Sequence, residues 1–166
     1  MPTILTHTVT LTTTDKPRIE RLINARTAKH PDDERSSHLT GAIGDVAFAA
    51  WAEHHRVLVE GPIAHSACNA VIRNRGSWSD RLRIGVRTTD ERKGTWQRAL
   101  RTSGFKVHRL AQARVDVVVL CSVAWDGEHP VVTLRGAFDV PGGVGRRADL
   151  ELDEEQLVDV TRFLPN

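Results

Sequence analysis

The chain has little cysteine and no long run of apolar residues, and each shortage narrows what it can be. The two cysteines, Cys68 and Cys121, fit a reducing cytoplasm and two buried thiols, while a disulfide between them stays open from the sequence. No apolar stretch approaches the roughly 20 residues that a membrane span needs. The first residues, MPTILTHTVT, lack the basic region and long apolar core of a signal peptide. We therefore expect a cytoplasmic protein without a membrane segment.

Several familiar catalytic and binding motifs are also missing. The glycine-rich stretch 141–147 lacks the Lys-Ser/Thr end of a phosphate-binding P-loop. His65 and Cys68 have the His-x-x-Cys spacing of a zinc site, but no second cysteine pair follows. Ser103 and Ser122 have no nearby histidine that could activate them as nucleophiles. These gaps argue against a P-loop nucleotide site, a zinc site and a serine nucleophile.

Charge is distributed unevenly along a chain of otherwise ordinary composition. Its 166 residues, 40% hydrophobic and 27% charged, fit one globular domain with a core of its own. Residues 73–114 carry 12 basic and 3 acidic side chains, whereas residues 115–166 carry 4 basic and 10 acidic ones. A block with a net charge of +9 is typical of a phosphate-binding face. A solvated basic face, balanced by the acidic C-terminal third, would give the same distribution of charge in the sequence.

Apolar periodicity predicts an α/β fold in one domain, with a central mixed sheet flanked by helices. A helix is expected to begin at Asp15, with Pro17 in its first turn, and to end before residues 30–34. Further helices are expected over residues 37–54, 95–101 and from 153 onward, where a capping box begins the last one. Strands are expected over residues 3–12, 56–60, 69–73, 82–89, 105–109, 115–124 and 131–138.

Two glycines interrupt the predicted helix over residues 37–54. Gly41 and Gly44 each cost about 1 kcal/mol relative to alanine in a helix interior. We therefore expect another group to approach the helix backbone there. Tight packing against the sheet would explain the same two residues equally well.

The order of these elements resembles the PD-(D/E)XK nuclease superfamily over residues 38–138. The resemblance is carried by the helix containing Gly41-Ala42-Ile43-Gly44-Asp45, two following strands, the basic strand Ile84-Gly85-Val86-Arg87, and a long apolar strand after it. It implies a restriction-endonuclease-like core over residues 38–138. Residues 1–37 would then add an N-terminal strand and helix, and residues 139–166 a loop and a C-terminal helix.

The resemblance also assigns four functional positions, of which one keeps a carboxylate. Asp45 would be the acid from the helix, and Asn69 stands where the family has a metal-binding aspartate. Gly85 and Arg87 stand where the family has its Glu-x-Lys pair. Magnesium prefers several oxygen ligands, and an arginine is a poor base. We therefore expect a vestigial, non-catalytic site without a metal cofactor.

An active Mg²⁺-dependent endonuclease remains an alternative, because acids can move within a site and keep their place in space. Asp80, Asp90, Glu91 and Asp116 are the candidates. Asp80 more plausibly stabilises a turn, and Asp90 and Glu91 more plausibly cap the next segment. Under this alternative Asp45 would hold the metal with Asp80 or Asp116.

The positive charge around the degenerate strand predicts nucleic-acid binding that needs no metal. Arginine forks suit phosphates and base edges, and the loss of carboxylates removes repulsion toward a phosphate backbone. The expected partner is DNA rather than RNA. The residues expected to contact it are Arg73, Arg75, Arg81, Arg83, Arg87, Arg92, Lys93 and Arg98.

A protein-interaction module, an inhibitor or regulator that binds an acidic partner through the same face, is the third reading. Trp78 and Trp96 flank the basic strand and could stack on bases, although packing aromatics explain them better. The N-terminal strand could pair across a dimer. A small phage or mobile-element protein would suit all three readings.

Overall fold

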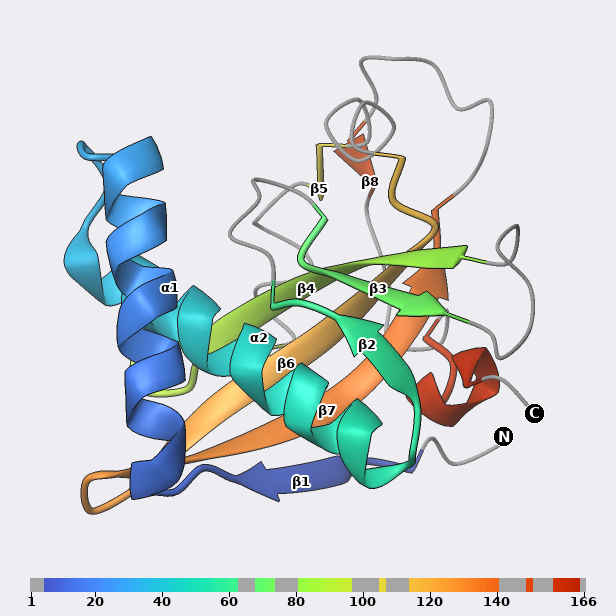
Figure 1. The fold of residues 1–166 in the computed structure, drawn as a ribbon, viewed down its shortest axis with the longest axis horizontal. Helices are drawn as coiled ribbons and strands as arrows, with labels where there is room; N and C mark the ends of the chain where they lie inside the picture. The colour runs from blue at the N-terminus through green and yellow to red at the C-terminus, as the bar shows by residue number, and fades with distance from the viewer. Residues whose placement is uncertain are drawn as a thin grey trace.

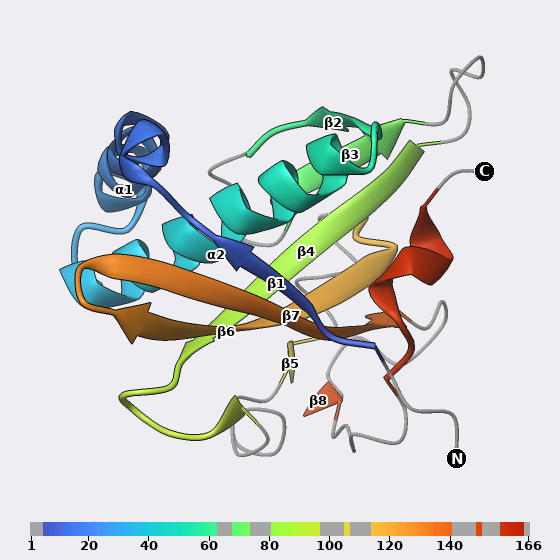
Figure 2. The ribbon, with the colours of Figure 1, turned by 90° about the horizontal axis from the view of Figure 1, so that it is seen from below.

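A six-stranded mixed sheet forms the centre of the computed structural model, which describes residues 5–62, 68–73, 81–96, 105–106, 114–140, 149–150 and 157–164. The strand order is β1-β7-β6-β4-β3-β2. Helices α1 (Lys16–Lys29) and α2 (Arg35–His54) lie on one side of this sheet, as Figure 1 and Figure 2 show. The α/β class with a mixed, helix-flanked sheet is therefore confirmed.

The strands of the sheet follow the predicted positions along the chain, with shifted ends. They are β1 (His7–Thr10), β2 (Leu58–Glu60), β3 (Ala70–Arg73), β4 (Arg81–Asp90), β6 (Val117–Asp126) and β7 (His129–Asp139). Only β4 and β6 pair in parallel, and the other neighbours are antiparallel. A separate two-stranded sheet joins β5 (Phe105–Lys106) to β8 (Asp149–Leu150), a strand that periodicity did not predict.

The start of α1 differs in detail from the prediction. Pro17 does lie in the first turn, but the Asp15 side chain makes no cap hydrogen bond to α1. Its Oδ2 instead accepts from the backbone N–H of Thr12 at 2.8 Å, which closes the 3₁₀ turn η1 (Thr13–Asp15). The aspartate therefore caps the turn that leads into the helix and not the helix itself.

Apolar side chains fill both faces of the sheet. On the helix side, Ile84 and Val86 of β4 join a large core cluster with α1 and α2. On the opposite side, Val118 and Leu120 of β6 join a smaller cluster. Because side chains alternate along a strand, β6 is buried on both faces, which explains its nearly continuous apolar sequence.

The predicted C-terminal helix is wrong over its described part, residues 157–164. Val158 forms an isolated bridge with Ala137 of β7, and a short 3₁₀ helix, η3 (Val160–Phe163), follows. Leu157 packs in the smaller cluster while Val160 packs in the larger one. Two residues three apart on an α-helix share one face and could not reach clusters on opposite sides of the sheet. The predicted capping box, residues 153–156, lies outside the described residues.

Among the described residues, no helix is long and apolar enough to cross a membrane.

Candidate functional site

Three of the four predicted vestigial positions, Asn69, Gly85 and Arg87, lie together where β3 begins beside β4. Asn69 precedes β3, and its Oδ1 accepts from the Val86 N–H at 2.8 Å and from Arg87 Nη1 at 3.4 Å. Arg87 Nη1 also donates to the Val86 carbonyl at 3.0 Å. The two side chains thus complete the hydrogen bonding of β4 where its neighbouring strand begins. Gly85 lies next to them on the same strand.

Asp45 of α2 is the fourth member, and it is buried. Its side chain is 1% exposed, against 20% for its partner Arg26, whose Nη2 donates to Oδ2 at 2.5 Å. Burial lowers the pKa of Arg87, while the nearby Asp45 carboxylate opposes that shift. The carboxylate is therefore in contact with one guanidinium, that of Arg26 on α1, and the charge of Arg87 on β4 acts on it in addition.

Arg26 was missed as a site residue, although the sequence held a sign of it. It follows Ile19, Leu22 and Ile23 at helical spacing on the stripe of α1 that faces the core. A charged residue on such a stripe needs a partner, because burying an unpaired charge is costly. The spacing within α1 cannot reveal that this partner lies on α2.

The two helix glycines are explained by groups that approach the helix, as predicted. A Cβ at Gly41 would lie 2.7 Å from Arg26 Nη1. A Cβ at Gly44 would lie 1.7 Å from Thr88 Oγ1. Both explanations given from the sequence apply, one to each glycine. The Arg26 guanidinium approaches the helix at Gly41, and the sheet packs tightly on it at Gly44.

Burial dominates the ionisation of Asp45. It raises the pKa of this carboxyl to about 7, although the charge and hydrogen bond of Arg26 and the charge of Arg87 act in the opposite direction. Oδ2 is engaged by Arg26, so a metal ion at this carboxylate would have to compete with a guanidinium. The chemistry that the cluster favours is recognition of an anion.

The described candidates for a relocated metal ligand are occupied by structural contacts. Asp116 Oδ2 accepts from the Arg83 N–H at 2.8 Å, next to the start of β6. Asp90 binds the Arg92 side chain, and Glu91 pairs with Arg135. Asp80 lies outside the described residues. Within the part of the chain that the structure describes, no group of three His, Cys, Asp or Glu side chains could hold a metal ion.

The predicted basic residues divide into two groups at opposite ends of β4. Arg73 on β3 is the register partner of Arg81, and Val71 is that of Arg83. Since Val71 belongs to the smaller cluster, Arg73, Arg81 and Arg83 share the sheet face that points away from the helices. We call these three residues the outer arginines. Arg73 is ion-paired with Glu60 of β2.

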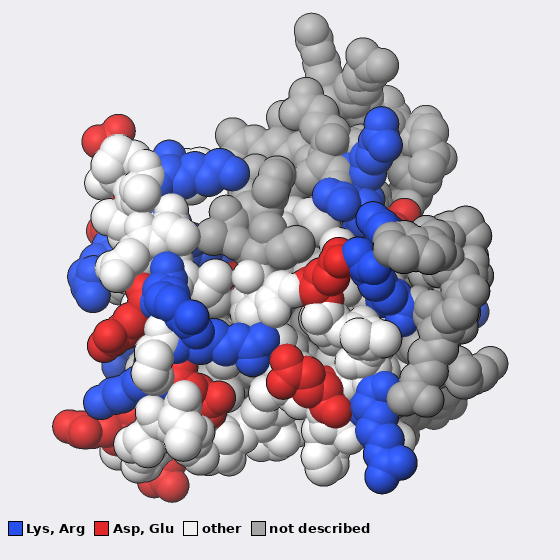
Figure 3. Space-filling model, in the orientation of Figure 1, with Lys and Arg blue, Asp and Glu red and all other residues white. Residues whose placement is uncertain are grey.

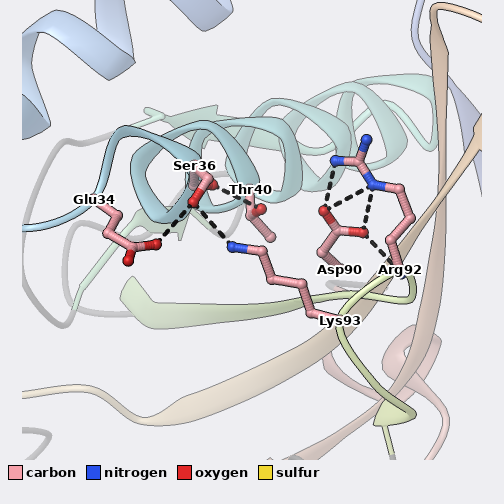
Figure 4. A network of polar contacts seen from close by, with 6 residues as sticks. All are labelled: Glu34, Ser36, Thr40, Asp90, Arg92 and Lys93. Carbon is pink, nitrogen blue, oxygen red and sulfur yellow. Dashed lines mark hydrogen bonds and ion pairs between the residues drawn. The ribbon is translucent and has the colours of Figure 1, made fainter.

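The second group, Arg92 and Lys93, follows β4 and is engaged with its neighbours (Figure 4). Arg92 donates to both oxygens of Asp90 and stacks over the Trp125 ring at 4.5 Å. Lys93 Nζ donates to Ser36 Oγ of α2 at 2.9 Å. A strand of this length spans roughly 30 Å, so these two residues do not extend the surface of the outer arginines. Arg75 and Arg98 lie outside the described residues.

Lys and Arg side chains do not cover one uniform face. Figure 3 shows them in two groups, one over α1 and one toward the β2–β3–β4 side, with acidic side chains between them.

The remaining candidates have structural roles where they are described. Trp96 packs on the smaller cluster beneath the Arg135 guanidinium at 5.5 Å, so it is a packing aromatic as favoured from sequence. Cys68 and Cys121 are both free and buried, and burial raises the pKa of each thiol. Trp78, His65 and Ser103 lie outside the described residues.

Comparisons of the chain with protein-family models, with curated proteins and with solved structures found no match.

Proposed function

We propose that this chain is a nucleic-acid-binding protein on a degenerate PD-(D/E)XK nuclease-like core, and that it binds without cleaving. The observation that carries the proposal is the engagement of Asp45 by Arg26 on the helix side of the sheet, together with the outer arginines on the opposite face. The single carboxylate left at the four family positions is engaged by a cation, and the outer arginines place positive charge on the sheet face that points away from the helices. Such a site attracts phosphate and competes with metal for its carboxylate.

The arrangement of elements supports the nuclease-like part of the proposal. Helix α2 is followed by β2, β3 and β4, which pair as antiparallel neighbours, and β6 then joins β4 in parallel. This is the order of helix and strands on which the resemblance rests. The hydrogen bonds of Asn69 to Val86 and Arg87, in the middle of β4, are compatible with the resemblance.

The chemistry of the cluster supports binding in place of cleavage. Metal-dependent nucleases use a cation to activate water and to stabilise the charge that develops on phosphorus. Arg87 keeps its proton under ordinary conditions and is engaged with Asn69 and the Val86 carbonyl. The proposal favours DNA as the ligand and places the protein in the cytoplasm, where two reduced thiols would persist.

Binding is tested with fluorescently labelled duplex DNA, single-stranded DNA and RNA, measured by anisotropy in EDTA. The test variant is Arg81→Glu/Arg83→Glu, and the matched control is Arg35→Glu/Arg162→Glu, which makes the same charge change on exposed positions of α2 and η3. We expect duplex DNA to bind with a strong salt dependence. The test variant should lose at least about tenfold in affinity and flatten the salt slope by roughly 2, whereas the control should change little.

Three outcomes would contradict the proposal. Equal losses in the test and control variants would mean that net charge, and not the sheet face, governs binding. Cleavage of plasmid by clean protein with Mg²⁺ or Mn²⁺, abolished by Asp45→Asn or Asp116→Asn, would establish the endonuclease alternative. A tight complex with an acidic protein, without affinity for any nucleic acid, would establish the interaction-module alternative.

A further inference from the structure

Three polar side-chain atoms around the Arg26–Asp45 pair are buried and have no hydrogen-bond partner within the described part of the chain. They are Arg26 Nε, Asp45 Oδ1 and Thr88 Oγ1, and they come from α1, α2 and β4. Buried polar atoms are almost always paired in folded proteins. This concentration of unpaired atoms on both sides of one ion pair indicates a place that receives a further polar group.

The contacts of Arg26 indicate which group that is. A guanidinium offers a planar fork whose two adjacent N–H groups match the oxygens of a carboxylate or phosphate. Asp45 engages only Nη2, through a single oxygen, and leaves Nε without a partner. The ion pair therefore neutralises Arg26 but uses only part of its hydrogen-bonding capacity.

Charge and access point in the same direction. Arg26 contacts Asp45, and the charge of Arg87 also acts on this carboxylate, so two positive charges stand against one negative charge and favour an anion. The Arg26 side chain is 20% exposed while that of Asp45 is 1% exposed, so an incoming anion meets the guanidinium first. Gly41 leaves the guanidinium room beside α2, because a Cβ there would lie 2.7 Å from Nη1.

We propose that Arg26 and Arg87 form a phosphate-binding pocket at the β4 edge, and that Asp45 is its built-in competitor, which holds Arg26 until a phosphate displaces it. The inference rests on the proposed function and deepens it by adding α1 to the binding surface. Its ligand is a phosphate group, from a nucleic-acid backbone or as a free anion.

The decisive variant is Asp45→Asn, which keeps the shape of the side chain and removes the competing charge. We expect about tenfold tighter binding of duplex DNA and a salt slope steeper by about 0.9, the value for one added phosphate contact. The matched control is Glu53→Gln. It removes the negative charge from another α1–α2 ion pair, Arg18–Glu53 at 3.2 Å, and so makes the same change in net charge on the same two helices. Arg18 keeps its hydrogen bond to the Gly61 carbonyl. Equal gains in both variants would overturn the proposal.

A second pair of variants keeps the proposal testable if Asp45→Asn fails to fold, as judged by circular dichroism and thermal unfolding. Arg26→Gln in the otherwise native chain should weaken DNA binding roughly threefold and lower the salt slope, whereas Arg18→Gln should leave both unchanged. Arg26→Gln should also cancel the gain of Asp45→Asn when the two are combined. An Arg26→Gln chain that binds as tightly as the native one overturns the pocket.

Titration with inorganic phosphate, followed by isothermal calorimetry, distinguishes a free anion from a nucleic-acid backbone as the ligand. It also distinguishes failure of the pocket from failure of the proposed function. Binding of phosphate to Asp45→Asn, lost on adding Arg26→Gln, supports the pocket even if no variant binds nucleic acid, a result that would remove the proposed function alone. If Arg81→Glu/Arg83→Glu abolishes DNA binding while Asp45→Asn matches the native chain toward both DNA and phosphate, the proposed function stands and the pocket is overturned.

Discussion

Burial governs the chemistry of Asp45 more strongly than its charged neighbours do. A carboxylate beside two guanidinium groups would ordinarily ionise more readily than one in water. Here the loss of solvent outweighs both, so the pKa is raised to about 7 and not lowered. The residue that looked like a surviving metal ligand in the sequence is therefore a carboxyl group that keeps its proton over part of the physiological range.

The raised pKa predicts how stability depends on pH. Between pH 3.8, the ordinary pKa, and about 7, the folded protein holds a proton on Asp45 that the unfolded chain has released. The free energy of unfolding should therefore fall as the pH rises through this window, by up to about 4 kcal/mol from this group. Urea denaturation at half-unit steps from pH 4 to 8 measures it.

Asp45→Asn should remove that contribution, so the native chain should lose stability relative to this variant as the pH rises. Asp116→Asn is the control, since it removes a carboxylate that accepts from the Arg83 backbone and should leave the slope in place. A constant difference between native and Asp45→Asn chains at every pH would show that burial does not shift this group.

At the scale of elements, the sequence predicted that another group approaches the backbone of α2, but it did not predict which residue that is. The helix glycines indicated a close approach, and their cost in helix propensity was the signal. The approaching groups, Arg26 and Thr88, lie on elements far away in sequence, so no local pattern identifies them. The prediction of a C-terminal helix was wrong for a related reason. The apolar spacing of this segment fits a helix, but Leu157 and Val160 pack on opposite faces of the sheet.

Gly44→Ala tests this contact directly. Alanine favours helix, but its Cβ would lie 1.7 Å from Thr88 Oγ1 and 2.8 Å from Thr88 Cβ, so strand and helix would have to separate. Overpacking of this kind costs about 1–3 kcal/mol, and we expect the upper part of that range in urea denaturation.

Gly41→Ala is the matched control in the same helix. The atom it would meet is the end of the long Arg26 side chain, which can move, so its cost should stay below about 1 kcal/mol. Thr88→Ala should recover part of the loss in a Gly44→Ala background. Equal costs at the two glycines, or no recovery, would show that the helix does not rest on Thr88.

At the scale of the whole molecule, the fold class could be predicted from the sequence better than the positions of charged side chains on the surface. Alternation and apolar runs report burial, so the strands and the buried centre followed from them. The grouping of Asp45, Asn69 and Arg87 was implied by the family resemblance and not by these patterns. The distribution of charge over the surface depends on strand length and register. For that reason Arg92 and Lys93 follow the end of β4 that lies opposite Arg81 and Arg83, and they do not share a surface with them.

The sheet order makes a prediction about the stability of the whole fold. Strand β6 lies between β4 and β7 and is buried on both faces, whereas β1 and β2 are the edges of the sheet. Amides of β6 should therefore exchange with solvent only through global unfolding, and those of β1 and β2 through local opening at lower free energy. Hydrogen exchange followed by NMR at several denaturant concentrations measures both. Protection of β2 equal to that of β6 would contradict this prediction and would mean that the outer edge of β2 is covered.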